Sequence, residues 1–386
     1  MSTAIFAANS AAATTDAANC KAYDHYHQLD RDYLTCNNAL KSEGLSSEER
    51  AMLLFGRGET AYFAGRFDIA IADLNESISL NPNFGEAYLR RGWTRNHLGE
   101  YSGALQDFSN FLEMEPDNPS ALFAIGFIYM GSSSWQTKTL PAFNRALEID
   151  PNNYLTRFNL ADIYSKRNGR PDLAVVEYDR ILKASDEEVS KVKMWRTPGR
   201  NGYFFKNRVR YVRVLALIDS GNLGVAMEAL NGLIVDQPEI PDPYVTRAYL
   251  NLNQHKYNEV LTDAEVVRRL DPFIEEYKQQ KLEALFYLKR YDEGVKSANV
   301  FLDGGLSNES KGFVLFWRGI FYKNLNNPEQ ALIDLENSFI LTPQNQMSII
   351  SRLIDRGYYT GSYNDAYSEK VRNGLQACLI DPECAT

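Results

Sequence analysis

The fold of this 386-residue chain is decided by residues 54–82, LFGRGETAYFAGRFDIAIADLNESISLNP. Two more segments repeat its pattern: YLRRGWTRNHLGEYSGALQDFSNFLEMEP ends at Pro116, and LFWRGIFYKNLNNPEQALIDLENSFILTP ends at Pro343. Each segment begins with an apolar stretch that contains an Arg-Gly pair, and a Gly or Asn then interrupts the apolar pattern. A second apolar stretch follows, with an alanine at the equivalent position of each segment (Ala70, Ala104 and Ala331). The closing Pro stops that stretch because proline cannot donate the hydrogen bond that continues a helix.

The spacing of the closing prolines gives the length of the repeat. The interval from Pro82 to Pro116 is the same as that from Pro238 to Pro272. Slightly more than twice this interval separates Pro272 from Pro343, which is room for two repeats. This pattern, with a period of about 34 residues, resembles the tetratricopeptide repeat (TPR), a helix–turn–helix unit. The resemblance implies an all-α, right-handed TPR superhelix, or α-solenoid, of about eight repeats with capping helices.

The resemblance also divides the chain into parts. Residues 1–19 are expected to be a disordered leader or signal remnant, and 20–50 an N-terminal capping helix. The solenoid is expected over 51–344, with a basic insertion near 186–203, and C-terminal capping helices over 345–386. Repeats three, four, five and seven match the pattern less well than the others. A capping box from Ser46 to Glu49 opens the first repeat, and the segment before it resembles that of bacterial exported TPR proteins.

An arginine and an aspartate recur at one fixed spacing in four repeats. They are Arg57 and Asp73, Arg91 and Asp107, Arg247 and Asp263, and Arg318 and Asp334. This spacing places the arginine on the first helix and the aspartate on the second, facing each other. An ion pair within each repeat is therefore favoured over a row of free arginines for anionic ligands.

Composition and charge exclude several classes of protein. Apolar residues make up 44% and charged residues 24% of the chain, and the formal net charge is −9. These fractions are those of an ordinary folded domain. No nucleic-acid partner is expected, because the balance of charge is acidic. The longest uncharged apolar run, Ala121 to Gly131, is far shorter than the roughly 20 residues of a membrane-spanning helix.

The four cysteines lie in two pairs at the ends of the chain, Cys20 with Cys36 and Cys378 with Cys384. Two local disulfides fit this layout and would indicate an oxidising compartment, so a periplasmic or secreted protein is expected. The alternative is four reduced, incidental thiols in a cytoplasmic protein.

No catalytic or metal-binding constellation is present in the sequence. There is no GxSxG, HExxH, P-loop or GxGxxG signature. Asp24, His25 and His27 lack a matching second motif and are interpreted as a solvated helix face. The sequence therefore predicts a protein that is not an enzyme, with no cofactor and no metal.

In the TPR family the first helix of each pair lines the concave groove, and that pattern assigns mostly aromatic side chains to a peptide-binding groove. An aromatic groove suits an apolar or extended peptide, whereas the alternative is that some of these rings fill space between repeats. The residues assigned to the groove are Phe55, Tyr62, Trp93, Asn96, Phe123, Phe127, Tyr211, Tyr249 and Phe316.

A TPR subtype that clamps the C-terminal carboxylate of chaperones uses Lys and Asn on its first three inner helices. Those positions here are Phe55, Glu59, Arg90, Ser120 and Ala124. The carboxylate clamp is therefore not expected.

The insertion is rich in basic residues, with eight and no acid between Val189 and Arg213. An anion-binding edge made by Lys193, Arg196, Arg200 and Arg210 is one interpretation, and a loop neutralised by acidic neighbours is the other.

The sequence thus predicts a non-catalytic adaptor or scaffold that binds a peptide or protein segment in the TPR groove. The alternative is an envelope-associated protein that binds anionic lipid or cell-wall polymer through the insertion. The sequence does not specify the partner or the oligomeric state.

Overall fold

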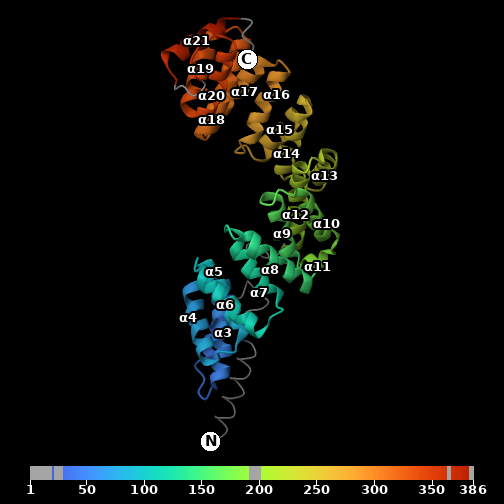
Figure 1. The fold of residues 1–386 in the computed structure, drawn as a ribbon, viewed down its shortest axis with the longest axis vertical. Helices are drawn as coiled ribbons and strands as arrows, with labels where there is room; N and C mark the ends of the chain where they lie inside the picture. Colours follow the sequence, from blue (N-terminus) through green and yellow to red (C-terminus); the bar gives the residue numbers. More distant parts are fainter. Residues whose placement is uncertain (1–19, 21–28, 191–200, 363–366, 382–386) are drawn as a thin grey trace. The chain divides into compact units, whose positions relative to one another are not determined.

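The computed structural model describes residues 20, 29–190, 201–362 and 367–381. Over these residues the chain forms twenty helices and no strand (Figure 1). It divides into two compact units, Met1–Ser220 and Gly221–Thr386. None of the described helices has the length and apolar content of a bilayer span.

Unit 1 contains a short N-terminal helix, four helix pairs and two further helices. These are α2 Leu29–Ala39, α3 Ser47–Phe63, α4 Phe67–Leu80, α5 Gly85–His97, α6 Tyr101–Met114, α7 Pro119–Met130, α8 Trp135–Ile149, α9 Tyr154–Lys166, α10 Pro171–Lys183, α11 Asp186–Ser190 and α12 Asn201–Asp219.

Unit 2 continues the alternation of helices to the C-terminal end. Its helices are α13 Leu223–Asp236, α14 Asp242–Asn253, α15 Tyr257–Leu270, α16 Glu276–Tyr287, α17 Tyr291–Asp303, α18 Asn308–Asn324, α19 Pro328–Leu341, α20 Pro343–Asp355 and α21 Glu369–Ile380.

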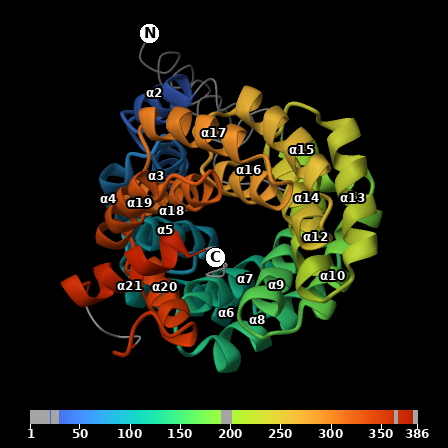
Figure 2. The ribbon, with the colours of Figure 1, turned by 90° about the horizontal axis from the view of Figure 1, so that it is seen from above.

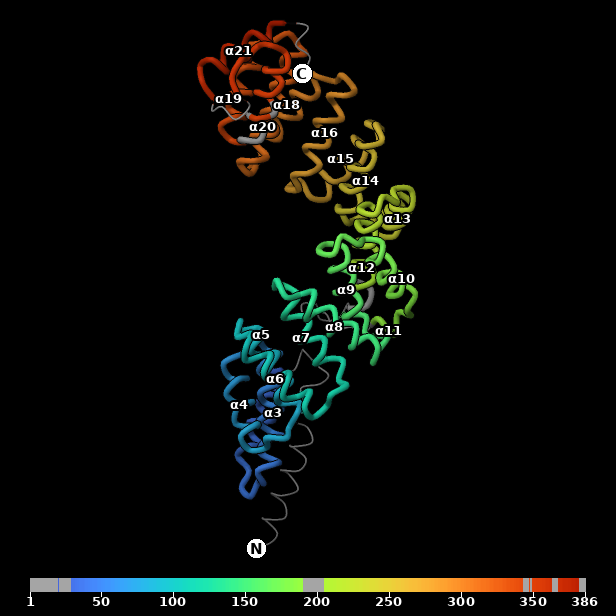
Figure 3. The backbone as a smooth tube through the Cα atoms, viewed as in Figure 1, coloured from blue at the N-terminus to red at the C-terminus, as the bar shows by residue number. Residues whose placement is uncertain are grey.

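This order of helices confirms the predicted all-α repeat architecture, and the chain path can be followed in Figure 3. Seven helix pairs pack as expected for the repeats: α3/α4, α5/α6, α7/α8 and α9/α10 in unit 1, and α14/α15, α16/α17 and α18/α19 in unit 2. The capping helix α2 precedes them, and α20 and α21 follow.

The turn within a pair is fixed by backbone conformation. Gly65, Gly99 and Asn326 have φ angles of 73°, 79° and 57° at the expected Gly or Asn break. Only glycine and a few polar residues adopt this left-handed conformation readily, so the break reverses the chain after the first helix.

Small residues let the two helices of a pair pack closely. A Cβ atom on Gly92 of α5 would lie 2.6 Å from the Phe108 ring of α6, so glycine is needed for this approach. Phe108 and Ala104 are fully buried there. Apolar side chains of the successive pairs from α3 to α9 join into one core, because a single pair cannot cover its own apolar face.

The predicted capping box at the start of α3 is confirmed. The Glu49 backbone N–H donates to Ser46 Oγ at 3.2 Å, and the Ser46 N–H donates to Glu49 Oε2 at 2.8 Å. This reciprocal pair satisfies two backbone donors that a helix start leaves without partners.

The helices of a pair have distinct places. First helices contact first helices of the next pair, as in α3 with α5, α14 with α16, and α16 with α18. Within unit 2, Figure 2 shows α14, α16 and α18 on the inner side and α13, α15 and α17 on the outer side. We call α14, α16 and α18 the inner helices of unit 2.

Candidate interaction face

All four arginine–aspartate pairs predicted from the regular spacing form in the structure. The N–O distances are 2.7 Å for Arg57–Asp73 and 2.6 Å for Arg91–Asp107, Arg247–Asp263 and Arg318–Asp334. Hydrogen bonding to Asp73 raises the pKa of Arg57, and the aspartates of all four pairs are buried. These arginines are therefore structural and do not form a row of free cations for a ligand.

Each of these arginines also reaches back to an asparagine that precedes its repeat. Arg91 Nη1 donates to Asn75 of α4 at 2.8 Å, and Arg247 Nη1 donates to Asn231 of α13 at 2.7 Å. Asn37 and Asn299 accept in the same way from Arg57 and Arg318. The guanidinium thus joins two helices of its own repeat and one helix before it, a contact that the sequence analysis did not anticipate.

The structure places three of the predicted groove residues in the core of unit 1. Trp93 is 8% exposed, and Tyr62 and Phe123 are also buried. The Trp93 ring lies edge-on to Phe108, with ring centres 5.4 Å apart, and 6.2 Å from the rings of Phe123 and Phe127. Their assignment to the groove surface is corrected accordingly: these rings fill the space between repeats.

The other predicted groove residues keep part of their surface accessible. Tyr249 of α14 is 48% exposed. The remaining residues are half-buried: Phe55, Asn96, Phe127, Tyr211 and Phe316.

An internal ion pair occupies the first inner positions of unit 1. Glu59 of α3 pairs with Arg90 of α5, and the carboxylate is buried. The Arg90 guanidinium lies over the Tyr62 and Phe63 rings, at 5.0 and 4.8 Å from their centres. Two positions of the carboxylate clamp are thus filled by an acid and a base that pair with each other.

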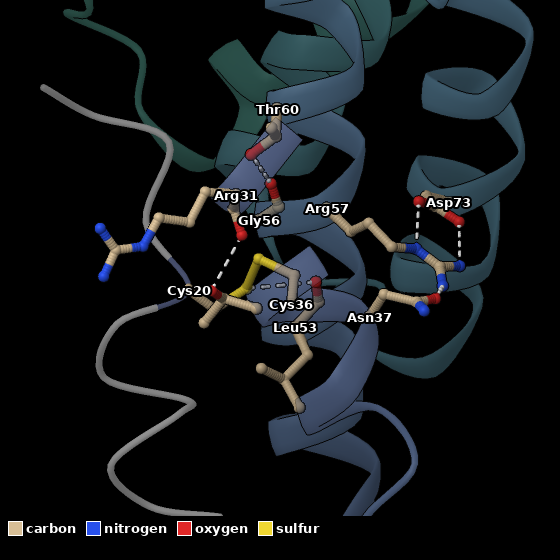
Figure 4. Close-up of a disulfide and its surroundings, with 10 residues drawn as sticks. Cys20, Arg31, Cys36, Asn37, Leu53, Gly56, Arg57, Thr60 and Asp73 are labelled. Carbon is tan, nitrogen blue, oxygen red and sulfur yellow. Dashed lines mark hydrogen bonds and ion pairs between the residues drawn. A yellow bond between two sulfur atoms is a disulfide. The ribbon is translucent and has the colours of Figure 1, made fainter. Parts of the chain in front are cut away.

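The N-terminal end of unit 1 is held by a disulfide (Figure 4). Cys20 and Cys36 are bonded, with their Cα atoms 4.9 Å apart, and both are buried. The bond lies against Gly56 and Leu53 of α3. Cys378 is also disulfide-bonded, and its expected partner Cys384 lies outside the described residues.

Most of the predicted anion-binding residues lie outside the described residues, namely Lys193, Arg196 and Arg200. Arg210 of α12 is half-buried and engaged with other groups. Two other basic side chains of α12 are neutralised, because Lys206 pairs with Asp186 at 2.6 Å and Arg213 pairs with Asp179. Arg208 of the same helix is exposed, and its guanidinium lies over the Phe158 ring.

The inner helices of unit 2 carry a different set of aromatic side chains. Tyr249 of α14 and Tyr287 of α16 are 48% and 50% exposed, and Phe286, Phe313 and Phe316 are half-buried. We call these five residues the aromatic face. Sequence reasoning did not assign Tyr287 to the groove, because a one-residue error of register turns a helix by about 100°.

Ring contacts hold the aromatic face in place. Trp317 of α18 lies between Phe286 and Phe316, with ring centres 5.3 and 5.7 Å away. Tyr287 stacks on Tyr257 of α15 at 4.9 Å, with an angle of 12° between the rings. The exposed Tyr287 ring is therefore held by packing and loses little freedom when a partner covers it.

No metal-binding group is found among the described residues: no three His, Cys, Asp or Glu side chains lie close enough to hold an ion. Asp24, His25 and His27 fall outside those residues.

The fold is that of a helical repeat protein. Its helices come in antiparallel pairs joined by short turns, and the first helix of one pair packs on the first helix of the next. Comparison with protein families gives the particular repeat. Models described as tetratricopeptide repeat match residues 55–119 and 142–175. The chain therefore carries tetratricopeptide repeats over these residues, and proteins with this repeat generally mediate protein–protein interactions or scaffolding.

Curated relatives share short segments with this chain. Sperm-associated antigen 1 of Mus musculus is 26% identical over 127 residues, which is 32% of this chain and 14% of the relative. The Hsp70-Hsp90 organizing protein of Triticum aestivum is 28% identical over 106 residues, which is 28% of this chain and 18% of the relative. The chain thus matches only a small part of these two relatives.

Solved structures of the same repeat type are similar at low identity. A tetratricopeptide repeat protein from Parabacteroides merdae is 17% identical, with a TM-score of 0.42 over 67% of this chain and 92% of the other. PilW, described as a type IV pilus biogenesis factor, is 13% identical, with a TM-score of 0.42 over 57% of this chain and 93% of the other.

Proposed function

We propose that this protein is a non-catalytic adaptor whose aromatic face on unit 2 binds a peptide or protein segment. The observation that carries the proposal is the exposure of two tyrosines, Tyr249 and Tyr287, on neighbouring inner helices. Tyrosine is enriched at binding surfaces because its ring buries a large apolar area while its hydroxyl stays hydrogen-bonded.

The two units differ in how they use their aromatic residues, and this difference supports unit 2 as the binding unit. The first helices of unit 1 have Trp93 and Phe123 in the core, and Glu59 engaged with Arg90. By contrast, the inner helices of unit 2 leave the rings of Tyr249 and Tyr287 accessible to solvent. Burial of one such ring stabilises a complex by roughly 1.5–3 kcal/mol.

Selection from a phage-displayed library of short random peptides on the immobilised full-length protein tests this proposal. The affinity of each selected peptide is then measured for the wild type and for a Tyr249→Ala, Tyr287→Ala variant. We expect the double variant to lose at least about tenfold in affinity. Tyr101→Ala is the matched control, because Tyr101 on the second helix α6 is 57% exposed. Equal affinities of the double variant and the control would contradict the proposed face.

We do not favour the alternative of an envelope protein that binds anionic lipid or cell-wall polymer. Lys206 and Arg213 of α12 already have carboxylate partners. The experiment for this alternative is sedimentation with vesicles that contain anionic lipid. Salt-sensitive binding that disappears in an Arg196→Glu, Arg200→Glu variant would favour it over the peptide-binding proposal.

We also propose that the protein works in the periplasm or is secreted. The support is the bonded state of Cys20, Cys36 and Cys378, because disulfides persist in oxidising compartments. Thiol titration of the unfolded, unreduced protein from its native source tests this. Four free thiols would contradict it.

A further inference from the structure

The carboxylate of Glu283 on the inner helix α16 is distinctive. It is half-buried, yet it has no hydrogen-bond or ion-pair partner within the described part of the chain. Other buried carboxylates of the first and second helices are paired, as Glu59 is with Arg90 and Asp263 is with Arg247. Burial alone raises the pKa of Glu283, with no cation opposing the shift.

The helix itself cannot neutralise this charge. Side chains one turn away on an α-helix are the neighbours that form local ion pairs. For Glu283 these are Gln279, Gln280, Phe286 and Tyr287, and none is a cation.

A second acceptor without a partner lies one turn before Glu283. Gln280 donates from Nε2 to the backbone carbonyl of Val245 on α14 at 3.2 Å. Its Oε1 atom is buried and accepts no hydrogen bond from the described residues. The reversed amide would place two oxygens in contact, so this orientation is the favourable one. Helix α16 thus carries, one turn apart, a carboxylate and a buried amide oxygen that have no donor among the described residues.

Exposed tyrosines lie on α16 itself and on the neighbouring inner helix α14. Tyr287 is one turn after Glu283, and the Tyr257 ring stacks on it. Burial raises the pKa of Tyr257, and the charges of Tyr287 and Glu283 raise it further. On α14, Tyr249 occupies the position in the preceding repeat that is equivalent to Glu283.

We propose that Glu283, Gln280 and the rings of Tyr249 and Tyr287 form a subsite for a lysine or arginine side chain of the bound polypeptide. A cationic side chain supplies several N–H donors to the two acceptors, and the tyrosine faces attract its charge. An acidic side chain would be repelled, and an apolar one would leave both acceptors without a partner. This inference rests on the proposed function, because it names the chemistry of the segment that the aromatic face binds.

The peptides selected on the wild-type protein provide the test. We expect them to be enriched in Lys or Arg. Two peptides are compared: a selected basic peptide, and the same peptide with its basic residue replaced by Gln. The affinity of each is measured for the wild type and for the Glu283→Gln and Glu276→Gln variants. Glu276 is an exposed glutamate at the start of the same helix and serves as the control.

Glu283→Gln is expected to lower the affinity for the basic peptide about tenfold and to leave the affinity for the Gln peptide nearly unchanged. The same variant is expected to raise the melting temperature of the free protein at neutral pH, because it removes a desolvated charge with no partner. A purely structural role for Glu283 would instead lower the melting temperature. A Glu283→Lys variant should reverse the preference towards acidic peptides.

The outcomes separate this inference from the proposed function. Peptides that depend on Tyr249 and Tyr287 but show no basic preference would overturn the cationic subsite and keep the aromatic face. Equal effects of Glu283→Gln and Glu276→Gln would overturn it as well. Failure of the tyrosine variants to alter any selected peptide would overturn the proposed function itself.

Discussion

Arg247 and Asp263 face each other across the α14/α15 pair in a two-point ion pair. Nε lies 3.0 Å from Oδ2, and Nη2 lies 2.6 Å from Oδ1. The side chain of Asp263 is 2% exposed, whereas Arg247 keeps 23% of its surface in water. The second guanidinium edge bonds Asn231, so one arginine connects three helices.

Removal of this carboxylate should therefore destabilise unit 2 more than removal of a surface ion pair. Asp263→Ala leaves the guanidinium without its partner, and we expect a loss of roughly 2–3 kcal/mol of unfolding free energy. Glu265→Ala is the control, because it breaks an exposed pair with Arg268 and should cost less than about 1 kcal/mol. Urea unfolding followed by circular dichroism measures both. Similar losses for the two variants would show that the repeated pair is not a structural clamp.

A methyl group at Gly56 should disturb the N-terminal disulfide. A Cβ atom there would lie 2.7 Å from Cys20 Sγ and 2.8 Å from the Cys20 carbonyl oxygen. Gly56→Ala is expected to lower the melting temperature by several degrees. Gly224→Ala on α13 is the control: its Cβ meets nothing within 4 Å, so alanine should be neutral or slightly stabilising. The effect of Gly56→Ala should shrink in a Cys20→Ser, Cys36→Ser background, and an unchanged effect would disprove this cause.

Stability in acid should depend on Glu275. Its carboxylate accepts the Ser307 N–H at 3.0 Å and the Ser307 hydroxyl at 2.9 Å, and it also accepts from the Ser310 hydroxyl. These bonds, led by the Ser307 backbone N–H, lower the pKa of Glu275 from its ordinary 4.5. A lowered pKa in the folded state means that the contribution is complete above about pH 4.5 and disappears as the pH falls through the folded value.

Glu275→Gln is accordingly expected to lower stability at pH 7 and to reduce the fall in stability below about pH 4.5. Chemical unfolding at a series of pH values from neutral to acid measures the effect, with Glu276→Gln as the neighbouring control. A variant whose stability falls as steeply in acid as that of the wild type would show that Glu275 is not responsible.

Truncation of Trp93 should lower the stability of the protein, whereas truncation of Tyr249 should lower its affinity for peptides. Trp93→Ala removes a ring packed against Phe108 and should cost about 3–5 kcal/mol of unfolding free energy. Tyr249→Ala removes a half-exposed ring and should change stability by less than about 1 kcal/mol while it weakens peptide binding. Thermal unfolding and peptide affinity, measured together, separate the two roles. If a fully folded Trp93→Ala protein lost peptide binding, the assignment of Trp93 to the core alone would be wrong, and the residue would belong to the binding surface.

The sequence by itself determined the repeat, the helix order and the ion pairs. Closing prolines such as Pro82 and Pro116 are backbone signals, and their regular spacing sets where each pair ends. The fixed spacing of Arg91 and Asp107 joins two positions of one rigid unit, so their contact follows from local geometry. The capping box at Ser46 is equally local.

Only the tertiary structure decided which aromatic rings face the solvent. Trp93 and Tyr249 occupy equivalent positions of their repeats, yet one is buried and the other is half-exposed. The difference depends on the packed neighbours: Phe108 of the same pair, and Phe123 and Phe127 of the next pair, enclose Trp93. The unpaired state of Glu283 could not be read from the sequence either, because it depends on which cations the packed neighbours bring within reach. Local spacing specifies the helix pair, whereas exposure and pairing depend on contacts between pairs.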